Sequence, residues 1–241
     1  MFEYFKATNN DRAFALCESA TRFVRCDLKK SQSGQKFCYS YSPVDNQIVF
    51  NASMKGARLL MQVFSETGDE SLRKEAADAV AYVMELQSEN GAWTYARGDA
   101  RKWVDNFHTA YILDCLDAYI ENSGDAFFSQ QRRKGLDYYV NYFFEPNGIP
   151  KYYDKSQHPI DATAAAQSIL TLARVGETKL AGKVAMWMIN NMFDERGYFY
   201  YQKHRFYTNK ISYMRWSNAW MFLALAYLLS CLCRVKNETI V

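Results

Sequence analysis

The sequence predicts an all-α fold, an α/α toroid, complete or partial, built of about four helical hairpins. Three observations predict it. A glycine-aromatic motif recurs along the chain, helical segments alternate between amphipathic and apolar character, and no segment shows the period-two pattern of a strand. We expect a single domain over residues 1–241, because a chain of this length can bury one sizeable core.

The recurring motif is a glycine followed closely by aromatic residues. It occurs at Gly34 (QKFCYSY), Gly91 (AWTY), Gly148 (IPKYY) and Gly197 (YFYY), at spacings of 57, 57 and 49 residues. Around each glycine the order is a helical run, the loop, a second helical run and a short turn, which gives four hairpins. The glycine permits a tight turn. The aromatic side chains either cover the end of the core, which is the more common use, or line an opening.

The two helices of each hairpin differ in character. Residues 70–87 place Leu72, Ala76, Ala79, Val80, Val83 and Leu86 on one face, as an amphipathic surface helix does. In contrast, residues 105–120, 161–175 and 219–229 are apolar or small on nearly all sides, so we expect buried helices there.

Amphipathic helices alternating with buried ones indicate an outer ring that covers an inner ring. An open α-solenoid remains an alternative, while eight helices in similar pairs argue against a four-helix bundle. If each glycine loop connects an outer helix to the next inner helix, all four loops and all four inner-helix N-termini lie at the same end of the ring.

Two resemblances agree with this architecture. The segment QSENGAW (residues 87–93) resembles the QW repeat of triterpene cyclases, which are α/α toroids, although the acidic D-x-D-D signature of those enzymes is not found. The segments NGAWTY, VDNFHTAYILDCL, IDATAAAQSIL and ISYMRWSNAWMFLALAYLL resemble bacterial toroid proteins encoded with polysaccharide-biosynthesis genes. The second resemblance implies an extracellular-polysaccharide context and supplies no reaction.

Polar residues open each predicted inner helix. Asn51, Asp105 and Asp161 are good N-cap residues, and capping alone would explain them. If the N-termini converge, the same residues form one site. Its candidate catalytic residues are then His108, Tyr213, Asp105 and Asp161, and its candidate substrate-binding residues are Trp93, Tyr95, Asn106, Tyr153, Arg215 and Trp216. His108 is the candidate base, because a helix N-terminus favours the neutral imidazole.

The charge distribution indicates an anionic ligand. The four predicted loops (28–50, 88–104, 147–160 and 193–212) hold 12 Lys and Arg against 6 Asp and Glu, whereas the rest of the chain holds 17 against 20. A positive, aromatic-rich surface suits an acidic polysaccharide or oligosaccharide. Nucleic acid fits less well, since no predicted helix carries a basic stripe.

Two reactions use these residue types. In the first, His108 or Tyr213 removes the proton beside a uronate carboxylate, Asn106 and Arg215 neutralise that carboxylate, and Tyr213 returns a proton, as in a lyase or epimerase. In the second, Asp105 and Asp161 act as the carboxylate pair of a glycosidase. A non-catalytic module that binds a glycan or a partner protein remains the alternative.

Other features bound the prediction. The six scattered cysteines form no C-x-x-C pair, so we expect neither a metal site nor disulfides, and no cofactor is predicted. The N-terminus lacks the pattern of a secretory signal, which favours the cytoplasm. The longest apolar run, 219–229, is too short for a membrane span and is expected to be a buried helix. The oligomeric state is not indicated.

Overall fold

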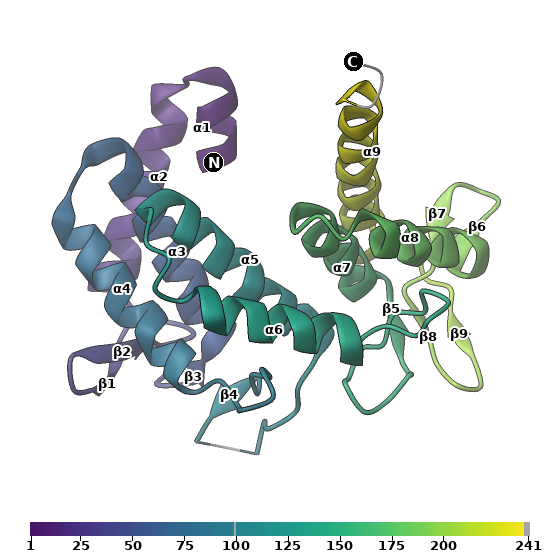
Figure 1. Cartoon of the computed structure of the whole chain (residues 1–241), viewed down its shortest axis with the longest axis horizontal. Coiled ribbons are helices and arrows are strands. Elements are labelled where there is room, and N and C mark those ends of the chain that lie inside the picture. The colour runs from purple at the N-terminus through teal and green to yellow at the C-terminus, as the bar shows by residue number, and fades with distance from the viewer. Residues whose placement is uncertain (99, 239–241) are drawn as a thin grey trace. The chain divides into compact units, whose positions relative to one another are not determined.

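The computed structural model describes residues 1–98 and 100–238 and confirms the four helical hairpins. In chain order the pairs are α2/α3, α4/α5, α6/α7 and α8/α9, and Figure 1 labels these helices. The helices are α1 (Phe2–Thr8), α2 (Asp11–Cys26), α3 (Phe50–Thr67), α4 (Glu70–Glu85), α5 (Asn106–Ser123), α6 (Ser129–Tyr142), α7 (Ala162–Arg174), α8 (Thr178–Met192), the π-helix η1 (Met214–Ala219) and α9 (Trp220–Glu238).

Short strands also occur, which the sequence did not predict. They are β1 (Lys30–Ser33), β2 (Lys36–Tyr39), β3 (Ile48–Val49), β4 (Ala96–Arg97), β5 (Ile160–Asp161), β6 (Phe193–Asp194), β7 (Tyr198–Phe199), β8 (Gln202–Lys203) and β9 (Thr208–Asn209). They pair antiparallel as β1–β2, β3–β4, β5–β8–β9 and β6–β7, all within the loops between helices. Strands of two to four residues are too short to show an alternating pattern.

The chain divides into two compact units. The first comprises Met1–Trp103 and Tyr111–Leu136, and the second comprises Val104–Ala110 and Asp137–Val241. The division falls within helices α5 and α6. The single domain over residues 1–241 that the sequence predicts stays a prediction.

In the first unit the predicted amphipathic helix is confirmed. Helix α4 buries Leu72, Ala76, Ala79, Val80 and Val83, and it packs on α3. Ile112, Leu113 and Leu116 of α5 are also buried and belong to this unit. The apolar stripe of α4 therefore faces the core, as its spacing predicts.

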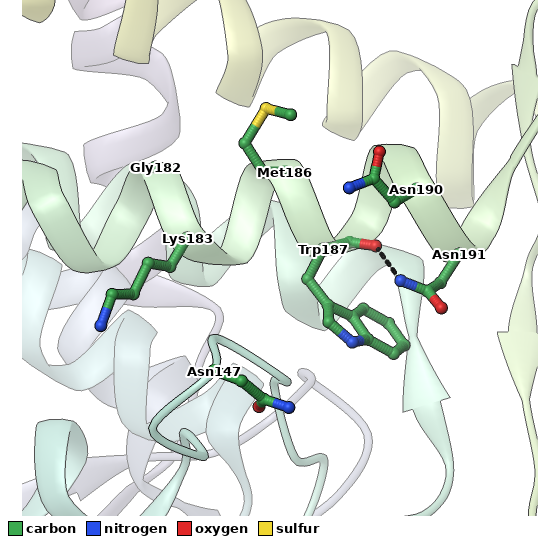
Figure 2. A pocket seen from close by; sticks show the side chains of 7 residues that line it. All are labelled: Asn147, Gly182, Lys183, Met186, Trp187, Asn190 and Asn191. Atoms are coloured by element: carbon green, nitrogen blue, oxygen red, sulfur yellow. Dashed lines mark hydrogen bonds between the residues drawn. The ribbon is translucent and has the colours of Figure 1, made fainter.

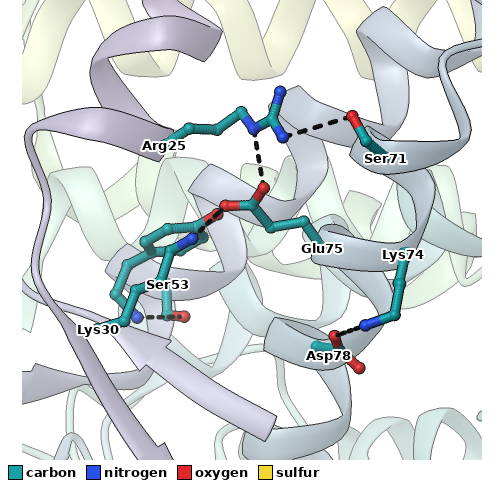
Figure 3. A network of polar contacts seen from close by, with 8 residues as sticks. Arg25, Lys30, Ser53, Ser71, Lys74, Glu75 and Asp78 are labelled. Atoms are coloured by element: carbon teal, nitrogen blue, oxygen red, sulfur yellow. Dashed lines mark hydrogen bonds and ion pairs between the residues drawn. The ribbon is translucent and has the colours of Figure 1, made fainter. Parts of the chain in front are cut away.

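A cluster of polar contacts around Glu75 links several elements of this unit (Figure 3). The Glu75 carboxylate accepts hydrogen bonds from Arg25 Nε at 2.7 Å, Lys30 Nζ at 2.5 Å and Tyr39 Oη at 2.8 Å. Its partners come from α2, β1 and β2, and the backbone N–H of Tyr39 donates to Ser53 Oγ of α3 at 3.1 Å. One carboxylate thus joins three elements to α4. Burial acts to raise the pKa of Glu75, but the hydrogen bonds from Lys30, Tyr39 and Arg25 outweigh it and lower the pKa.

In the second unit α7 is the central helix. It packs against both α8 and α9 (Figure 1), and nearly all its residues are buried. Small side chains such as Ala164, Ala165 and Ala166 let the neighbouring backbones approach closely. The prediction of a buried helix at 161–175 is confirmed.

The prediction that 219–229 forms a buried helix is wrong. Met221, Ala224 and Leu228 of α9 are buried, but Phe222 is 76% exposed and Leu229 is 61% exposed. Helix α9 is apolar on all sides, but other parts of the chain do not bury it on all sides. By length and composition the stretch Met214–Arg234 could cross a membrane, with 22% of its most apolar window buried. Core helices of other proteins pass the same test, so this is weak evidence for a span.

The motif glycines make the tight turns that the sequence predicts. All four have a positive φ, between 62° and 95°. Two of them also bring the loop against the outer helix of the next hairpin. A Cβ on Gly91 would lie 2.2 Å from the Lys134 carbonyl oxygen of α6, and one on Gly148 would lie 2.7 Å from the Lys183 carbonyl carbon of α8. At these two positions only glycine fits without displacing backbone.

The segment with the QW-like pattern has a clear packing role. Gln87 Nε2 donates to the carbonyl oxygens of Gly91 at 3.0 Å and Gln131 at 2.9 Å. The Trp93 indole N–H donates to the Val83 carbonyl at 3.1 Å, and the indole ring lies against Gly135. The pattern therefore locks the Gly91 loop onto α4 and α6.

Candidate active site

Asp105 and His108 form a hydrogen-bonded pair at the start of α5. The backbone N–H of His108 donates to Asp105 Oδ1 at 2.8 Å, so Asp105 caps the helix as predicted. The same carboxylate binds the ring, with His108 Nδ1 2.8 Å from both Asp105 Oδ1 and Asp105 Oδ2. The Asp105 side chain is fully buried and that of His108 is 23% exposed. A proton on Nδ1, directed at Asp105, leaves the basic lone pair on Nε2.

Two tyrosines run alongside this pair. Tyr153 forms a bridge with Asp105, and the Asn106 N–H donates to the Tyr152 carbonyl at 2.8 Å. Burial raises the pKa of Tyr152, and the charges of Asp105 and Asp161 raise it further. The Tyr152 hydroxyl thus feels both candidate carboxylates and stays protonated near neutral pH.

Asp161 caps α7 and is held by a second residue. The Ala164 N–H donates to Asp161 Oδ1 at 2.9 Å, and Gln202 Nε2 of β8 donates to Asp161 Oδ2 at 2.7 Å. Burial raises the pKa of Asp161 above the usual aspartate value, although the hydrogen bonds from Ala164 and Gln202 oppose it. This carboxyl group is therefore harder to ionise than an exposed aspartate.

Aromatic side chains gather where η1 begins. The Tyr201 and Tyr213 rings are 4.9 Å apart, and the Tyr213 and Trp216 rings are 5.4 Å apart. Burial raises the pKa of Tyr201, and the charge of Asp161 adds to the effect. Arg215 is exposed, with its guanidinium 5.9 Å from the Trp216 ring centre. The π-helix η1 carries the candidates Arg215 and Trp216, Tyr213 is the residue before it, and such helices recur at functional sites.

Asn106 holds helices together inside the second unit. Its Oδ1 accepts from Tyr139 Oη at 2.8 Å and Ser168 Oγ at 2.7 Å, and its Nδ2 donates to the Lys151 carbonyl at 3.1 Å. The residue is 0% exposed. These contacts join α5, α6 and α7 and leave the amide no surface to present to a substrate.

Trp93 and Tyr95 lie in the first unit, whereas the other eight predicted residues lie in the second. Trp93 is 1% exposed, so its ring packs and has no open face for a sugar. Tyr95 is half-buried and stacks on Trp103 at 5.1 Å between ring centres. The predicted common rim of all four loops stays a prediction, and the grouping described above belongs to the second unit alone.

The capping prediction for Asn51 is wrong. The residue before α3 is Val49, and Asn51 lies inside the first turn, 6% exposed. Within the described part of the chain, its Oδ1 has no hydrogen-bond partner. The strand β3 extends the chain to Val49, so the helix begins before the asparagine.

Three residues of this grouping were not predicted: Tyr152, Tyr201 and Gln202. Gln202 and Tyr201 reach Asp161 and Tyr213 through the pairing of β8 with β5. Tyr152 and Tyr201 are part of the glycine-aromatic motifs and Gln202 follows one of them, but the motif does not reveal the strand register.

Comparison with known proteins identifies the fold. No family model matches the chain, and no curated protein matches it significantly. Solved structures do match: cellobiose 2-epimerase from Bacillus thermoamylovorans (TM-score 0.74, 12% identity, 95% of this chain and 69% of that one) and unsaturated glucuronyl hydrolase from Bacillus sp. GL1 (TM-score 0.70, 12% identity, 98% and 72%). A GH76 α-mannanase from Bacteroides thetaiotaomicron also matches (TM-score 0.67, 13% identity, 98% and 67%).

These similar structures are α/α-toroid carbohydrate-active enzymes, and the predicted fold class is confirmed. At such low identity the similarity establishes the fold and not the activity. The chain spans 62% of one similar sugar epimerase, from a ruminal bacterium, and about 70% of the others named above.

Proposed function

We propose that this protein is a carbohydrate-active enzyme that removes a proton beside the carboxylate of a uronate in an acidic glycan. The observation that carries the proposal is the Asp105–His108 pair, a buried carboxylate that orients a partly exposed imidazole through Nδ1. Such a pair leaves Nε2 as a base and stabilises the cation formed when it accepts a proton.

The reaction has a defined balance. His108 Nε2 takes the proton from the carbon beside the uronate carboxylate, and the electron pair left behind delocalises into that carboxylate. In elimination, the neighbouring carbon–oxygen bond then breaks, a double bond forms and a tyrosine hydroxyl protonates the leaving oxygen. In epimerisation, a proton returns to the same carbon from the opposite face. Either course needs a proton donor and a cation near the carboxylate.

Residues of the second unit fit these roles. Tyr213 is the donor that the sequence indicates, and Tyr152 is a second phenol that stays protonated beside Asp105 and Asp161. Arg215 is the exposed cation, and Trp216 and Tyr153 provide partly exposed rings for the sugar face. Asn106 and Trp93 are left out of substrate contact, because both are buried in packing and hydrogen bonds.

The known structures of similar fold support a sugar ligand. They include a hydrolase named for unsaturated glucuronyl groups, a cellobiose 2-epimerase, a protein named as a sugar epimerase and a mannose isomerase. The resemblance to toroid proteins of polysaccharide-biosynthesis loci is the further reason to propose a role in making or modifying a polysaccharide.

The test is to incubate purified protein with a panel of uronate-containing and neutral polysaccharides. Unsaturated products are followed by ultraviolet absorbance, and deuterium uptake beside the carboxylate is followed by NMR. We expect turnover on a uronate glycan that falls by about 10²- to 10⁴-fold in His108→Ala, the usual contribution of a general base. The matched control is His204→Ala, since His204 stacks on Tyr207 and is not part of the site. Full turnover in His108→Ala would contradict the proposal.

One observation favours a second candidate. The raised pKa of Asp161 suits a general acid of a glycosidase. In that case Asp161→Asn would abolish hydrolysis of a neutral or acidic oligosaccharide, and His108→Ala would spare it. Binding without turnover on every glycan would instead favour the non-catalytic module.

A further inference from the structure

An open groove lies along α8, beside the loop that carries Asn147. It has a volume of about 430 Å³, which is within the usual range for small-molecule sites. Figure 2 shows the side chains of Lys183 and Trp187 extending from α8 toward the loop that carries Asn147. The groove shares no lining residue with the Asp105–His108 site.

The walls of the groove are fixed in place. Gly148 packs so closely on α8 that a Cβ would lie 2.7 Å from the carbonyl carbon and the Cβ of Lys183. The turn itself is closed by the Gly148 N–H, which donates to the Glu145 carbonyl at 2.8 Å. Lys183 Nζ donates to the Pro146 carbonyl at 3.2 Å and ties the helix to the same turn. The groove therefore exists before a ligand arrives, which lowers the cost of binding.

The side chains that line the groove suit an anionic sugar. Trp187 supplies an indole ring, on which the apolar face of a pyranose can stack. Asn147, Asn190 and Asn191 carry amides, which both donate and accept hydrogen bonds and so match sugar hydroxyls. Asn191 Nδ2 already donates to the Trp187 carbonyl at 2.9 Å, which leaves its other donor and its oxygen for a ligand.

The charge of the groove lining favours anionic sugars over neutral ones. Lys183 is the charged residue of the lining, and of the described residues that line the groove none is acidic. A second cation, Lys203 Nζ, lies 5.8 Å from the Trp187 ring centre. Met186 and Trp187 supply the apolar part of the lining.

We propose that the Trp187 groove is a binding subsite for a uronate-bearing oligosaccharide, with Trp187 as the stacking platform and Lys183 as the partner of the carboxylate. The subsite does not depend on catalysis at His108. It would hold a glycan chain on the outer surface of the second unit.

The test uses calorimetric titration of the full chain with short oligomers of galacturonate, glucuronate and mannuronate, and with a cello-oligosaccharide of matched length. We expect at least one uronate oligomer to bind and the neutral oligomer to bind more weakly. Trp187→Ala should lower the affinity by about tenfold, as expected for loss of a stacking platform. Lys183→Ala should lower it for the uronate oligomer only.

Matched controls lie on the same helix. Ile189→Ala and Lys179→Ala remove an exposed apolar and a basic side chain of α8 outside the groove, and both should leave affinity unchanged. The titrations are repeated in His108→Ala, where binding should persist, so that failure of the proposed catalysis is separated from failure of the subsite. The proposal is overturned if no uronate oligomer binds, if the neutral oligomer binds equally well, or if Trp187→Ala binds as the unchanged protein does while circular dichroism shows both folded.

Discussion

Asp105 shows how one carboxylate can cap a helix and orient a neighbouring side chain at the same time. It caps α5 through the His108 N–H and orients the His108 ring with the same carboxylate. Both contacts span three positions in the chain, but only the capping contact was predicted from the sequence. Capping and catalysis were weighed as alternatives, but the geometry permits both at once.

Burial at single residues was harder to predict. Asn106 and Trp93 carry the chemistry of ligand-binding side chains, yet their partners are Ser168 and Gly135, far away in the sequence. The same limit applies to Gln202, whose contact with Asp161 depends on the register of β8. Contacts between residues far apart in the chain depend on tertiary packing, and no local sequence pattern predicts them.

Glu75 gives a pH-dependent prediction. Because its pKa is lowered in the folded chain, the carboxylate contributes stability above its unfolded value of 4.5, and this contribution is lost as the pH falls through the folded pKa. Glu75→Gln should lower the free energy of unfolding at pH 7 by about 2 kcal/mol, since it weakens several charge-assisted hydrogen bonds. Denaturant titration between neutral and acidic pH measures this, and the difference from the unchanged protein should shrink toward low pH.

The control for this prediction is Glu85→Gln. Glu85 pairs with Lys36, but the Glu85 side chain is 54% exposed, so solvent screens the pair. Its loss should change stability by less than about 0.5 kcal/mol. A difference for Glu75→Gln that stays constant across the pH range would contradict the assigned role of the carboxylate.

Among the secondary-structure elements, the sequence predicted the helices well, but it predicted only in part which helix faces are buried. The period of the α4 sequence identified its buried face, and the composition of α7 identified a core helix. Helix α9 was predicted to be buried on nearly all sides, but Phe222 and Leu229 are exposed while Met221, Ala224 and Leu228 are buried. The composition of a helix shows which of its faces could be buried. Whether they are buried depends on which other helices and loops pack against it.

The contact between a glycine loop and the next outer helix gives a second prediction. Gly148→Ala would set a Cβ against the Lys183 backbone, whereas the same change at Gly197 meets open space. Both have a positive φ, so both variants carry backbone strain of about 1 kcal/mol or more. Only Gly148→Ala must also displace α8 or its own loop.

Thermal unfolding measures the difference. Gly148→Ala should be the less stable variant by at least about 2 kcal/mol, in line with the cost of forced overpacking. Gly91→Ala, which meets the Lys134 carbonyl oxygen, should behave like Gly148→Ala. Equal melting temperatures for the Gly148 and Gly197 variants would show that the loop can move aside without cost.

For the whole molecule, charge separates the loops from the rest of the chain. The chain carries a net charge of +3, and the loops predicted from sequence are its basic part. Binding of an acidic glycan should therefore weaken as salt rises from about 50 to about 500 mM, because screening shortens the reach of the surface field. Titration with a uronate polymer at several salt concentrations tests this. A neutral polymer serves as the control, and its binding should not change. A salt-independent affinity for the uronate polymer would mean that charge plays no part in selection.

The turn around Gly148 limits the distance between the Trp187 groove and the residues around Asp105. Asn147, at one end, borders the Trp187 groove, and Tyr152, five residues on, lies beside Asp105. Five residues of fully extended chain reach at most about 18 Å. A short glycan is therefore long enough to contact both the Trp187 groove and Tyr152. A glycan held in the groove at one end would have a raised local concentration of its other end near Asp105.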